Sequence, residues 1–405
     1  MLHVLSTDEV FKLIDSLSLK ETGTETVSLA EALFRVTAEA VTASEYVPGF
    51  DRSTVDGYAV RANDTFGCSE SIPAMLPCDG AILMGEDAGS PLPAGTLRAI
   101  PTGGALPEGA DCVIMKEYTE DYGDGTIGIF RPVSPGENVI YRGDDVKPGQ
   151  VVLPAGKRLT PPDIGALAAI GCAEVCVRRK PKVAILSTGD ELIPVTGTPE
   201  GGQIRDVNSH LLCAFCQSFG AEPVNYGIIR DDETLLGRAL DRAVAESDMV
   251  LLSGGSSVGD KDASCRIIES RGELLMHGIA MKPGKPTILG IIQEKPVFGL
   301  PGHPAAAAFS AHLFVKRAIL RLTGAACTEY TFPAVLSETL GANHGRTQYN
   351  GVRLVPGAAN LTAVPIRSKS GLITTLSGSD GYISVPGECE GISAGEEVMV
   401  HRFDS

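Results

Sequence analysis

The pattern of apolar and polar positions changes character three times along the chain. Ser6 with Glu9 and Ser28 with Glu31 have the spacing of capping boxes, so we expect a short helix after each serine. From about residue 43 to residue 149, short apolar runs are separated by Gly and Pro clusters, which predicts strands and hairpins. The first third of the chain therefore predicts two helices followed by a small β domain.

A regular alternation of strands and helices begins at about residue 180, after a helix predicted to start at Pro161 with Thr160 as its cap. Such alternation is typical of parallel βαβ units. The apolar run over 304–322 predicts the helix that closes this domain, and the Gly-rich alternating residues from about 328 predict a separate small β barrel or sandwich. The expected segments are strands over 183–186, 224–229, 249–252, 288–291 and 297–300, with helices over 209–219 and 233–245.

Length, charge and cysteine content narrow the class of protein. A chain of 405 residues fits two to four domains. The net charge of −16 disfavours partners that bind through a broad basic field, so we expect neither nucleic acid nor a membrane surface as partner. No apolar run reaches spanning length and no basic leader precedes Asp8, which predicts a cytoplasmic protein. The ten cysteines, including the CxxC of Cys213 and Cys216, are typical of reduced core residues.

Polar and glycine residues follow the predicted strands directly, and these positions are where ligands bind in open parallel sheets. Gly and Ser allow backbone N–H groups to approach a phosphate closely, whereas carboxylates would repel it unless a divalent cation lies between them. A Mg²⁺-bridged pyrophosphate or nucleotide fits both observations. The alternative is that each carboxylate is an ordinary helix cap or solvated loop charge. The loops are 187–191, 230–232, 253–262 and 300–304, with Asp190, Glu191, Asp231, Asp260 and Asp262 as their carboxylates.

Lys282 and Lys285 lie in a Lys-Pro-Gly-Lys-Pro turn, and the prolines restrict the movement of both lysines. We expect this turn to bind a compact oxyanion, with ordinary surface lysines as the alternative. Phosphate-loop, dinucleotide-binding and HExxH motifs are absent from the sequence. Gly255 to Gly259 match GxSxG, so a serine hydrolase with Ser257 as nucleophile remains a rival, although acids before the downstream histidines are sparse.

The combination of motifs resembles the MoeA family, the molybdopterin molybdenumtransferases that include the E domain of gephyrin. The resemblance covers nearly the whole chain. It rests on the stretches 50–59, 102–104, 109–111, 142–145, 187–192, 206–209, 253–262, 281–286 and 300–304.

The resemblance implies a multidomain α/β plus β protein. Residues 1–44 together with 146–179 would form an extended linking and dimerisation region, and residues 45–145 a β-rich domain. Residues 180–327 would form a MoaB/MogA-like α/β domain with a mostly parallel sheet that binds molybdopterin, and residues 328–405 a small C-terminal β barrel. It further implies a homodimer, so that residues from one subunit complete the site of the other.

By the same resemblance, the chain inserts molybdate into adenylyl-molybdopterin with Mg²⁺ as cofactor and releases AMP, and other proteins of molybdenum cofactor synthesis could be partners. The implied metal ligands are Glu191, Asp231 and Asp262, with Asp56 and Asp145 reaching in from the second subunit. Lys282, Lys285 and Pro301 would face molybdate. The implied substrate-binding residues are Thr102, Ser187, Thr188, Gly189, Asp190, Asn208, Gly254, Gly255 and Ser256, with Arg346, Arg353 and Ser370 contributed by the C-terminal domain. A non-catalytic molybdopterin-binding scaffold with this fold remains an alternative.

Overall fold

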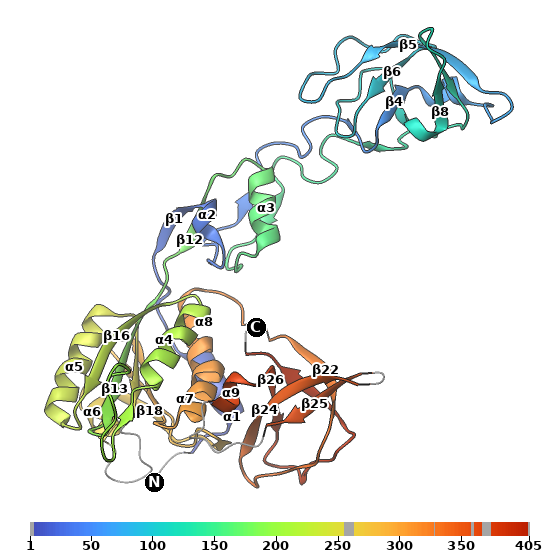
Figure 1. Cartoon of the computed structure of the whole chain (residues 1–405). Helices are drawn as coiled ribbons and strands as arrows, with labels where there is room; N and C mark the ends of the chain where they lie inside the picture. The colour runs from blue at the N-terminus through green and yellow to red at the C-terminus, as the bar shows by residue number, and fades with distance from the viewer. Residues whose placement is uncertain (1–3, 255–262, 328, 358–359, 367–373, 404–405) are drawn as a thin grey trace.

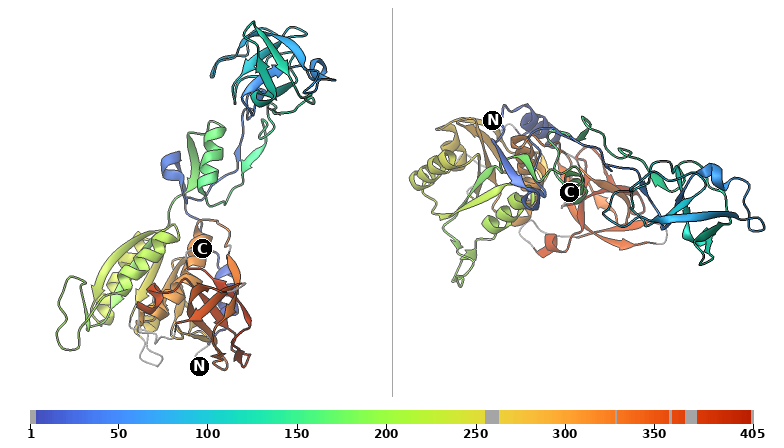
Figure 2. Two further views of the ribbon diagram at one scale, coloured as in Figure 1. Left: turned by 45° about the vertical axis from the view of Figure 1, so that its right-hand side comes forward. Right: turned by 90° about the horizontal axis from the view of Figure 1, so that it is seen from above.

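The computed structural model describes residues 4–254, 263–327, 329–357, 360–366 and 374–403. The chain forms an elongated molecule (Figure 1). A β domain lies at one end, a small linking region in the middle, and the α/β domain lies beside the C-terminal barrel at the other end. The turned views of Figure 2 show the same separation of the β domain from the other parts.

The linking region contains two passages of the chain. Strand β1 (Thr24–Ser28) pairs antiparallel with β12 (Glu174–Arg178), and β2 (Val41–Thr42) pairs with β11 (Val151–Leu153). Helices α2 (Leu29–Ala32) and α3 (Pro161–Ala169) pack on these strands around Leu159, Leu167 and Val177. Helix α3 begins as predicted, with a capping box between Thr160 and Asp163.

The β domain is built on one six-stranded sheet in the order β7-β4-β6-β5-β9-β8. Its core contains Val60, Leu97, Ile114 and Ile129. A short pair, β3 (Arg52–Ser53) with β10 (Val139–Ile140), adjoins it. The strands of the sheet are β4 (Gly57–Val60), β5 (Ala74–Ala81), β6 (Leu97–Ile100), β7 (Cys112–Met115), β8 (Thr119–Asp121) and β9 (Thr126–Ile129).

The α/β domain confirms the predicted mostly parallel sheet. Its strand order is β16-β13-β17-β21-β20-β18, in which the first four strands are parallel to one another and β20 pairs antiparallel with both β21 and β18. The strands are β13 (Lys182–Thr188), β16 (Glu222–Ile229), β17 (Met249–Ser253), β18 (Glu273–His277), β20 (Ile288–Ile292) and β21 (Lys295–Leu300).

Helices cover both faces of this sheet because successive residues of each buried strand point to opposite sides. Ala184 and Leu186 pack against α5 (Glu233–Glu246) and α6 (Ala263–Glu269). Val183 and Ile185 belong to the core on the opposite side, with α4 (Asn208–Ser218), α7 (Pro304–Ser310) and α8 (Lys316–Leu322).

One predicted helix differs from expectation in its geometry and another in the domain against which it packs. The apolar run over 304–322 forms one continuous helical segment, but its middle, Ala311–Val315, is a π-helical turn between α7 and α8. Helix α1 (Thr7–Ser16) begins at the predicted Ser6 capping box. It belongs to the α/β core rather than the linking region, because Val10 and Ile14 are fully buried there and Asp15 pairs with Arg317. In the described part of the chain no helix is long and apolar enough to cross a bilayer.

The C-terminal domain is a closed β barrel, as expected. Strand β22 (Thr331–Leu336) pairs with β25 (Leu361–Pro365) and β28 (Glu397–His401), and β24 (Thr347–Pro356) pairs with β25 and β26 (Gly381–Val385). The β26–β28 contact closes the ring. Strand β19 (Met281–Lys282) of the α/β domain adds to β24 in parallel, which joins the two domains directly.

Candidate functional site

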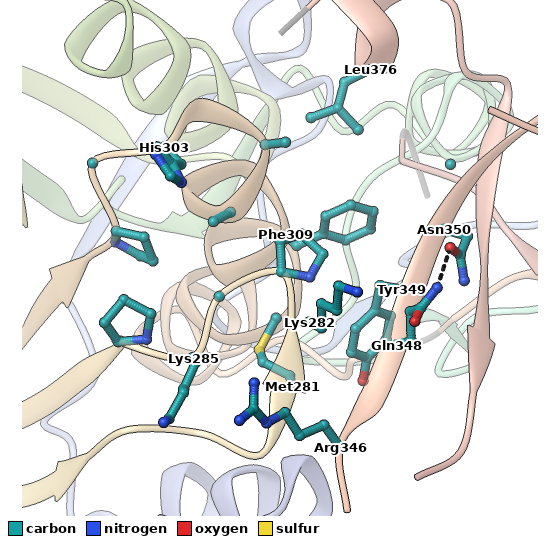
Figure 3. A pocket seen from close by; sticks show the side chains of 18 of the residues that line it. Met281, Lys282, Lys285, His303, Phe309, Arg346, Gln348, Tyr349, Asn350 and Leu376 are labelled. Atoms are coloured by element: carbon teal, nitrogen blue, oxygen red, sulfur yellow. Dashed lines mark hydrogen bonds between the residues drawn. The ribbon is translucent and has the colours of Figure 1, made fainter. Parts of the chain in front are cut away.

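A cleft of about 1070 Å³ lies between the α/β domain and the C-terminal barrel of the same chain. Figure 3 shows its side chains converging from the loops of the α/β domain on one side and from strand β24 on the other. This size exceeds that of a typical small-ligand pocket and suits a long substrate. Its lining includes Glu191, Asp231, Gly254, Met281, Lys282, Lys285, Pro301, Gly302, His303, Phe309, Arg346, Gln348, Tyr349, Asn350, Leu376 and Ser379.

The acidic wall of the cleft comes from the loops after β13 and β16. These strands are parallel neighbours, so the residues that follow them meet at one edge of the sheet. Glu191 and Asp231 line the cleft with exposed side chains. Thr188 Oγ1 donates a 2.6 Å hydrogen bond to Asp231 Oδ1, and the Asp231 amide donates to Asp190 Oδ1 at 3.4 Å. Asp231 is thereby oriented, and its second carboxylate oxygen accepts no hydrogen bond from the residues that the structure describes.

Two of the predicted glycines allow the chain segments at this edge of the sheet to approach each other closely. Gly254, directly after β17, has a φ of +96°, and a Cβ atom there would lie 2.1 Å from the carbonyl oxygen of Thr188. A Cβ atom on Gly189 would lie 2.7 Å from the carboxylate of Glu191. Larger residues would therefore displace the strand end or the carboxylate.

Ser187 and Asn208 were predicted to contact substrate, but neither lines the cleft. Both are buried, and they connect the loops from behind: Ser187 Oγ donates to Asp206 Oδ1 at 3.0 Å. Asn208 Nδ2 donates at 2.9 Å to both Ser253 Oγ and the Gly302 carbonyl oxygen. These contacts indicate that Asn208 positions the loop that carries Pro301.

The cationic part of the cleft combines Lys282 and Lys285 with Arg346 of the barrel. Figure 3 shows the three side chains on neighbouring backbone segments. None of them forms an ion pair with a carboxylate in the part of the chain that the structure describes. Their charge is thus available to an anion, as the prediction for the two lysines requires.

Two buried hydroxyl groups hold the lysine turn from behind. Thr287 Oγ1 donates to the Gly284 carbonyl oxygen at 2.7 Å and lies 2.8 Å from Ser310 Oγ. Thr287 and Ser310 are both fully buried. Gly284 has a φ of +118°, and a Cβ atom there would lie 2.7 Å from the Met281 side chain and 3.1 Å from Ser310 Oγ. The positions of both lysines therefore depend on this packing.

Asp56 and Thr102 lie together in the β domain and do not line the cleft of their own chain. Asp56 Oδ1 accepts hydrogen bonds from the Thr102 amide at 2.7 Å and from Thr102 Oγ1 at 2.8 Å, and these bonds lower the pKa of the Asp56 carboxyl. Asp56 directly precedes β4, which Figure 1 places at the far end of the molecule. Asp145 is exposed, and its amide donates to the Val47 carbonyl oxygen where the β domain joins the linking region.

The remaining predicted residues fall into two groups. Arg353 is exposed on β24 and does not line the cleft. Outside the described residues lie Gly255, Ser256, Asp262 and Ser370, together with Ser257 of the hydrolase hypothesis. Among the described residues no group of three or more His, Cys, Asp or Glu side chains is arranged to hold a metal, so the three-carboxylate site that includes Asp262 stays a prediction.

The barrel wall of the cleft was mostly missed in the sequence. Besides Arg346, it contains Gln348 and Asn350, which follow at intervals of two residues. Such alternation places side chains on one face of a strand, so the segment Arg-Thr-Gln-Tyr-Asn carried a usable signal. What the pattern could not show is that this face meets the α/β domain. The apolar residue Leu376 of the C-terminal domain also lines the cleft, together with Phe309 from α7 of the α/β domain.

Three family models together match most of the chain. The MoeA N-terminal region (domain I and II) matches residues 5–171, a probable molybdopterin binding domain matches residues 184–321, and the MoeA C-terminal region (domain IV) matches residues 333–403. The cleft lies between the parts matched by the second and third models.

Relatives match over nearly their whole length. The molybdopterin molybdenumtransferases of Bacillus subtilis and Haemophilus influenzae are 35% and 34% identical to this chain, covering 94% and 95% of it and 90% and 95% of the relatives. A crystal structure of the molybdopterin biosynthesis MoeA protein from Pyrococcus horikoshii superposes with a TM-score of 0.86 at 34% identity, over 98% of this chain and 100% of that one. The chain therefore belongs to the MoeA family of molybdenum cofactor biosynthesis and is a transferase, as these two relatives are named.

Proposed function

We propose that this chain is a molybdopterin molybdenumtransferase that inserts molybdate into adenylyl-molybdopterin with the help of Mg²⁺ and releases AMP. The anhydride bond of the substrate is hydrolysed to give AMP, while the two dithiolene sulfurs bind molybdenum in place of oxide. The observation that carries this proposal is one cleft lined by two carboxylates, Glu191 and Asp231, and by three cations, two from the lysine turn and one from the barrel.

The acidic wall fits Mg²⁺. Mg²⁺ prefers oxygen ligands and is commonly bound by one or two carboxylates together with water and substrate phosphates. Glu191 and Asp231 supply two carboxylates in the cleft, and the hydrogen bond from Thr188 orients the second. Asp262 is the third ligand expected from the family resemblance.

The cationic part of the cleft fits molybdate, which is a compact dianion. Lys282, Lys285 and Arg346 offer three positive charges and several N–H donors to its oxygens. The rigid support of the lysine turn by Thr287 lowers the entropic cost of bringing these groups together.

The chain's own residues bind and orient two charged groups next to each other. Glu191 and Asp231 fix the pyrophosphate end, and the lysine turn holds molybdate where the dithiolene can reach it. When bound, Mg²⁺ neutralises pyrophosphate charge and makes AMP a better leaving group. Holding both reactants in one cleft converts an encounter of two anions into an oriented reaction.

We further propose that the active unit is a homodimer in which the β domain of one subunit approaches the cleft of the other. Asp56 and Asp145 are exposed and lie outside the cleft of their own chain, which leaves them available to a second copy. The hydrogen bonds from Thr102 lower the pKa of Asp56 and so favour its anionic form.

A single-turnover assay tests the proposed reaction. Purified protein is mixed with adenylyl-molybdopterin, molybdate and Mg²⁺, and AMP and inserted molybdenum are measured. We expect both products from the wild type and neither after chelation of Mg²⁺. Binding of the substrate without AMP release would support the scaffold alternative. Labelling of Ser257 by a fluorophosphonate, with no molybdenum insertion, would support the hydrolase alternative.

A further inference from the structure

Strand β24 carries an amide side chain next to the cationic part of the cleft, at a position that the proposed reaction does not use. Gln348 lies directly opposite Lys282 in the parallel β19–β24 pair, so the two side chains stand beside each other. Figure 3 shows Gln348 and Asn350 at the side of the cleft away from His303, with Lys282 and Phe309 between.

Asn350 fixes the orientation of the Gln348 amide. Gln348 Nε2 donates a 2.8 Å hydrogen bond to Asn350 Oδ1. A carboxamide has two N–H donors and one carbonyl acceptor, so this bond leaves Gln348 one N–H donor and its Oε1 acceptor for a ligand. Both residues are only partly exposed, which limits competition by water for these groups.

The cleft that Gln348 lines also has apolar side chains. Phe309, Leu376 and Ile366 are among its lining residues. A flat heterocycle with one polar edge matches such surroundings, because its faces contact apolar groups while its edge forms hydrogen bonds. The lactam edge of a pterin, an N–H next to a carbonyl, pairs with a carboxamide through two parallel hydrogen bonds.

From the amide position we infer that Gln348, oriented by Asn350, binds the pyrimidinone edge of the pterin ring of the substrate. This inference rests on the proposed function and deepens it. In adenylyl-molybdopterin the dithiolene lies between the pterin and the pyrophosphate. The cleft takes its carboxylates from loops of the α/β domain, its lysines from β19 and the turn that follows it, and its amides from barrel strand β24, which pairs with β19.

Adenine is the other heterocycle of the substrate, and one substitution separates the two. In Gln348→Glu the carboxylate can accept from the N–H and the amino group of a pterin, so pterin binding persists. The same carboxylate would repel the ring nitrogen acceptor of adenine or any oxyanion. Gln348→Leu removes hydrogen bonding to a pterin, to adenine and to an oxyanion alike.

The test is a fluorescence titration of the full-length protein with 6-hydroxymethylpterin, a probe that lacks phosphate, dithiolene and adenine. We expect Gln348→Leu to weaken binding about tenfold, as the loss of two hydrogen bonds of roughly 0.7 kcal/mol each implies. The dissociation constant of Gln348→Glu for the probe should stay within about threefold of the wild-type value. Gln217→Leu, the same change at an exposed amide of α4, is the matched control and should leave binding unchanged.

Three outcomes would overturn the inference: no saturable pterin binding by the wild type, unchanged binding by Gln348→Leu, or displacement of the probe by adenosine together with loss of binding in Gln348→Glu. Circular dichroism and unchanged molybdate binding verify that the leucine variant is folded. The AMP-release assay of the wild type separates failure of this inference from failure of the proposed function, since it does not depend on Gln348 variants.

Discussion

Replacing Thr287 by Val tests whether the buried hydroxyl pair positions the lysine turn. Valine has nearly the same shape, but it removes the 2.7 Å bond to the Gly284 carbonyl oxygen and the 2.8 Å contact with Ser310 Oγ. The Gly284 carbonyl keeps the 3.2 Å bond from the residue 287 amide. Ser310 Oγ, fully buried, loses its contact with the Thr287 hydroxyl.

Loss of a buried partner costs about 1–3 kcal/mol. For a domain of this size each kcal/mol lowers the thermal midpoint by about 2–4 °C. The unfolding transition of the α/β domain should therefore shift to lower temperature by several degrees. We also expect molybdate affinity to fall by roughly three- to tenfold, because the turn gains freedom that anion binding must then remove. Differential scanning calorimetry and isothermal titration with molybdate measure the two effects.

Thr323→Val is the matched control. Thr323 is buried at the end of α8, where its Oγ1 donates to the Leu320 carbonyl oxygen at 2.9 Å, and it does not line the cleft. This variant should lose stability without losing molybdate affinity. If Thr287→Val bound molybdate as tightly as Thr323→Val, the hydroxyl pair would not position the anion site.

Further predictions concern charge at the cleft, the dimer and the domain interface. Lys285→Ala should weaken molybdate binding by about ten- to a hundredfold in calorimetric titrations, since it removes a charge-assisted contact; unchanged affinity would place the anion elsewhere. Asp231→Asn keeps an acceptor for Thr188 but removes a charge, so the Mg²⁺ concentration needed for half-maximal AMP release should rise by about tenfold or more; an unchanged requirement would exclude Asp231 as ligand. Mixing inactive Asp56→Ala and Lys282→Ala subunits should restore part of the activity if the site is shared, whereas two separate sites would give none. Burial, with a smaller effect of Lys316, lowers the pKa of His312 from 6.5 to about 3. Because the folded-state pKa is depressed, stability is complete above about pH 6.5 and is lost as the pH falls toward 3; His312→Leu should flatten this decline in a series of thermal midpoints.

The carboxylates of the cleft could be predicted from the sequence, because the alternation of strands and helices is enough to show which strand ends lie side by side. Parallel strands bring their carboxyl ends to one edge, so the residues after β13 and β16 had to be neighbours once the βαβ alternation was recognised. The same reasoning located Gly254 and Pro301. Ser187 and Asn208 do not line the cleft of the structure, and a strand-end position does not reveal whether a side chain faces a cleft or supports the loop from behind.

The barrel wall depends on contacts between distant segments. The β19–β24 pairing joins Lys282 to Gln348, which are far apart in the sequence, and periodicity within either segment carries no information about it. Helix α1 shows the same limit. Its capping box located the helix start, but its apolar face could have packed on any domain, and it packs on α8.

The most direct test of the central claim is the position of the oxyanion in a crystal soaked with molybdate, located by anomalous scattering from molybdenum. The account predicts the anion in the cleft between the α/β domain and the barrel, within hydrogen-bond distance of Lys282, Lys285 and Arg346. An anion bound at a different place, with the cleft of the same crystal free of molybdenum, would contradict it.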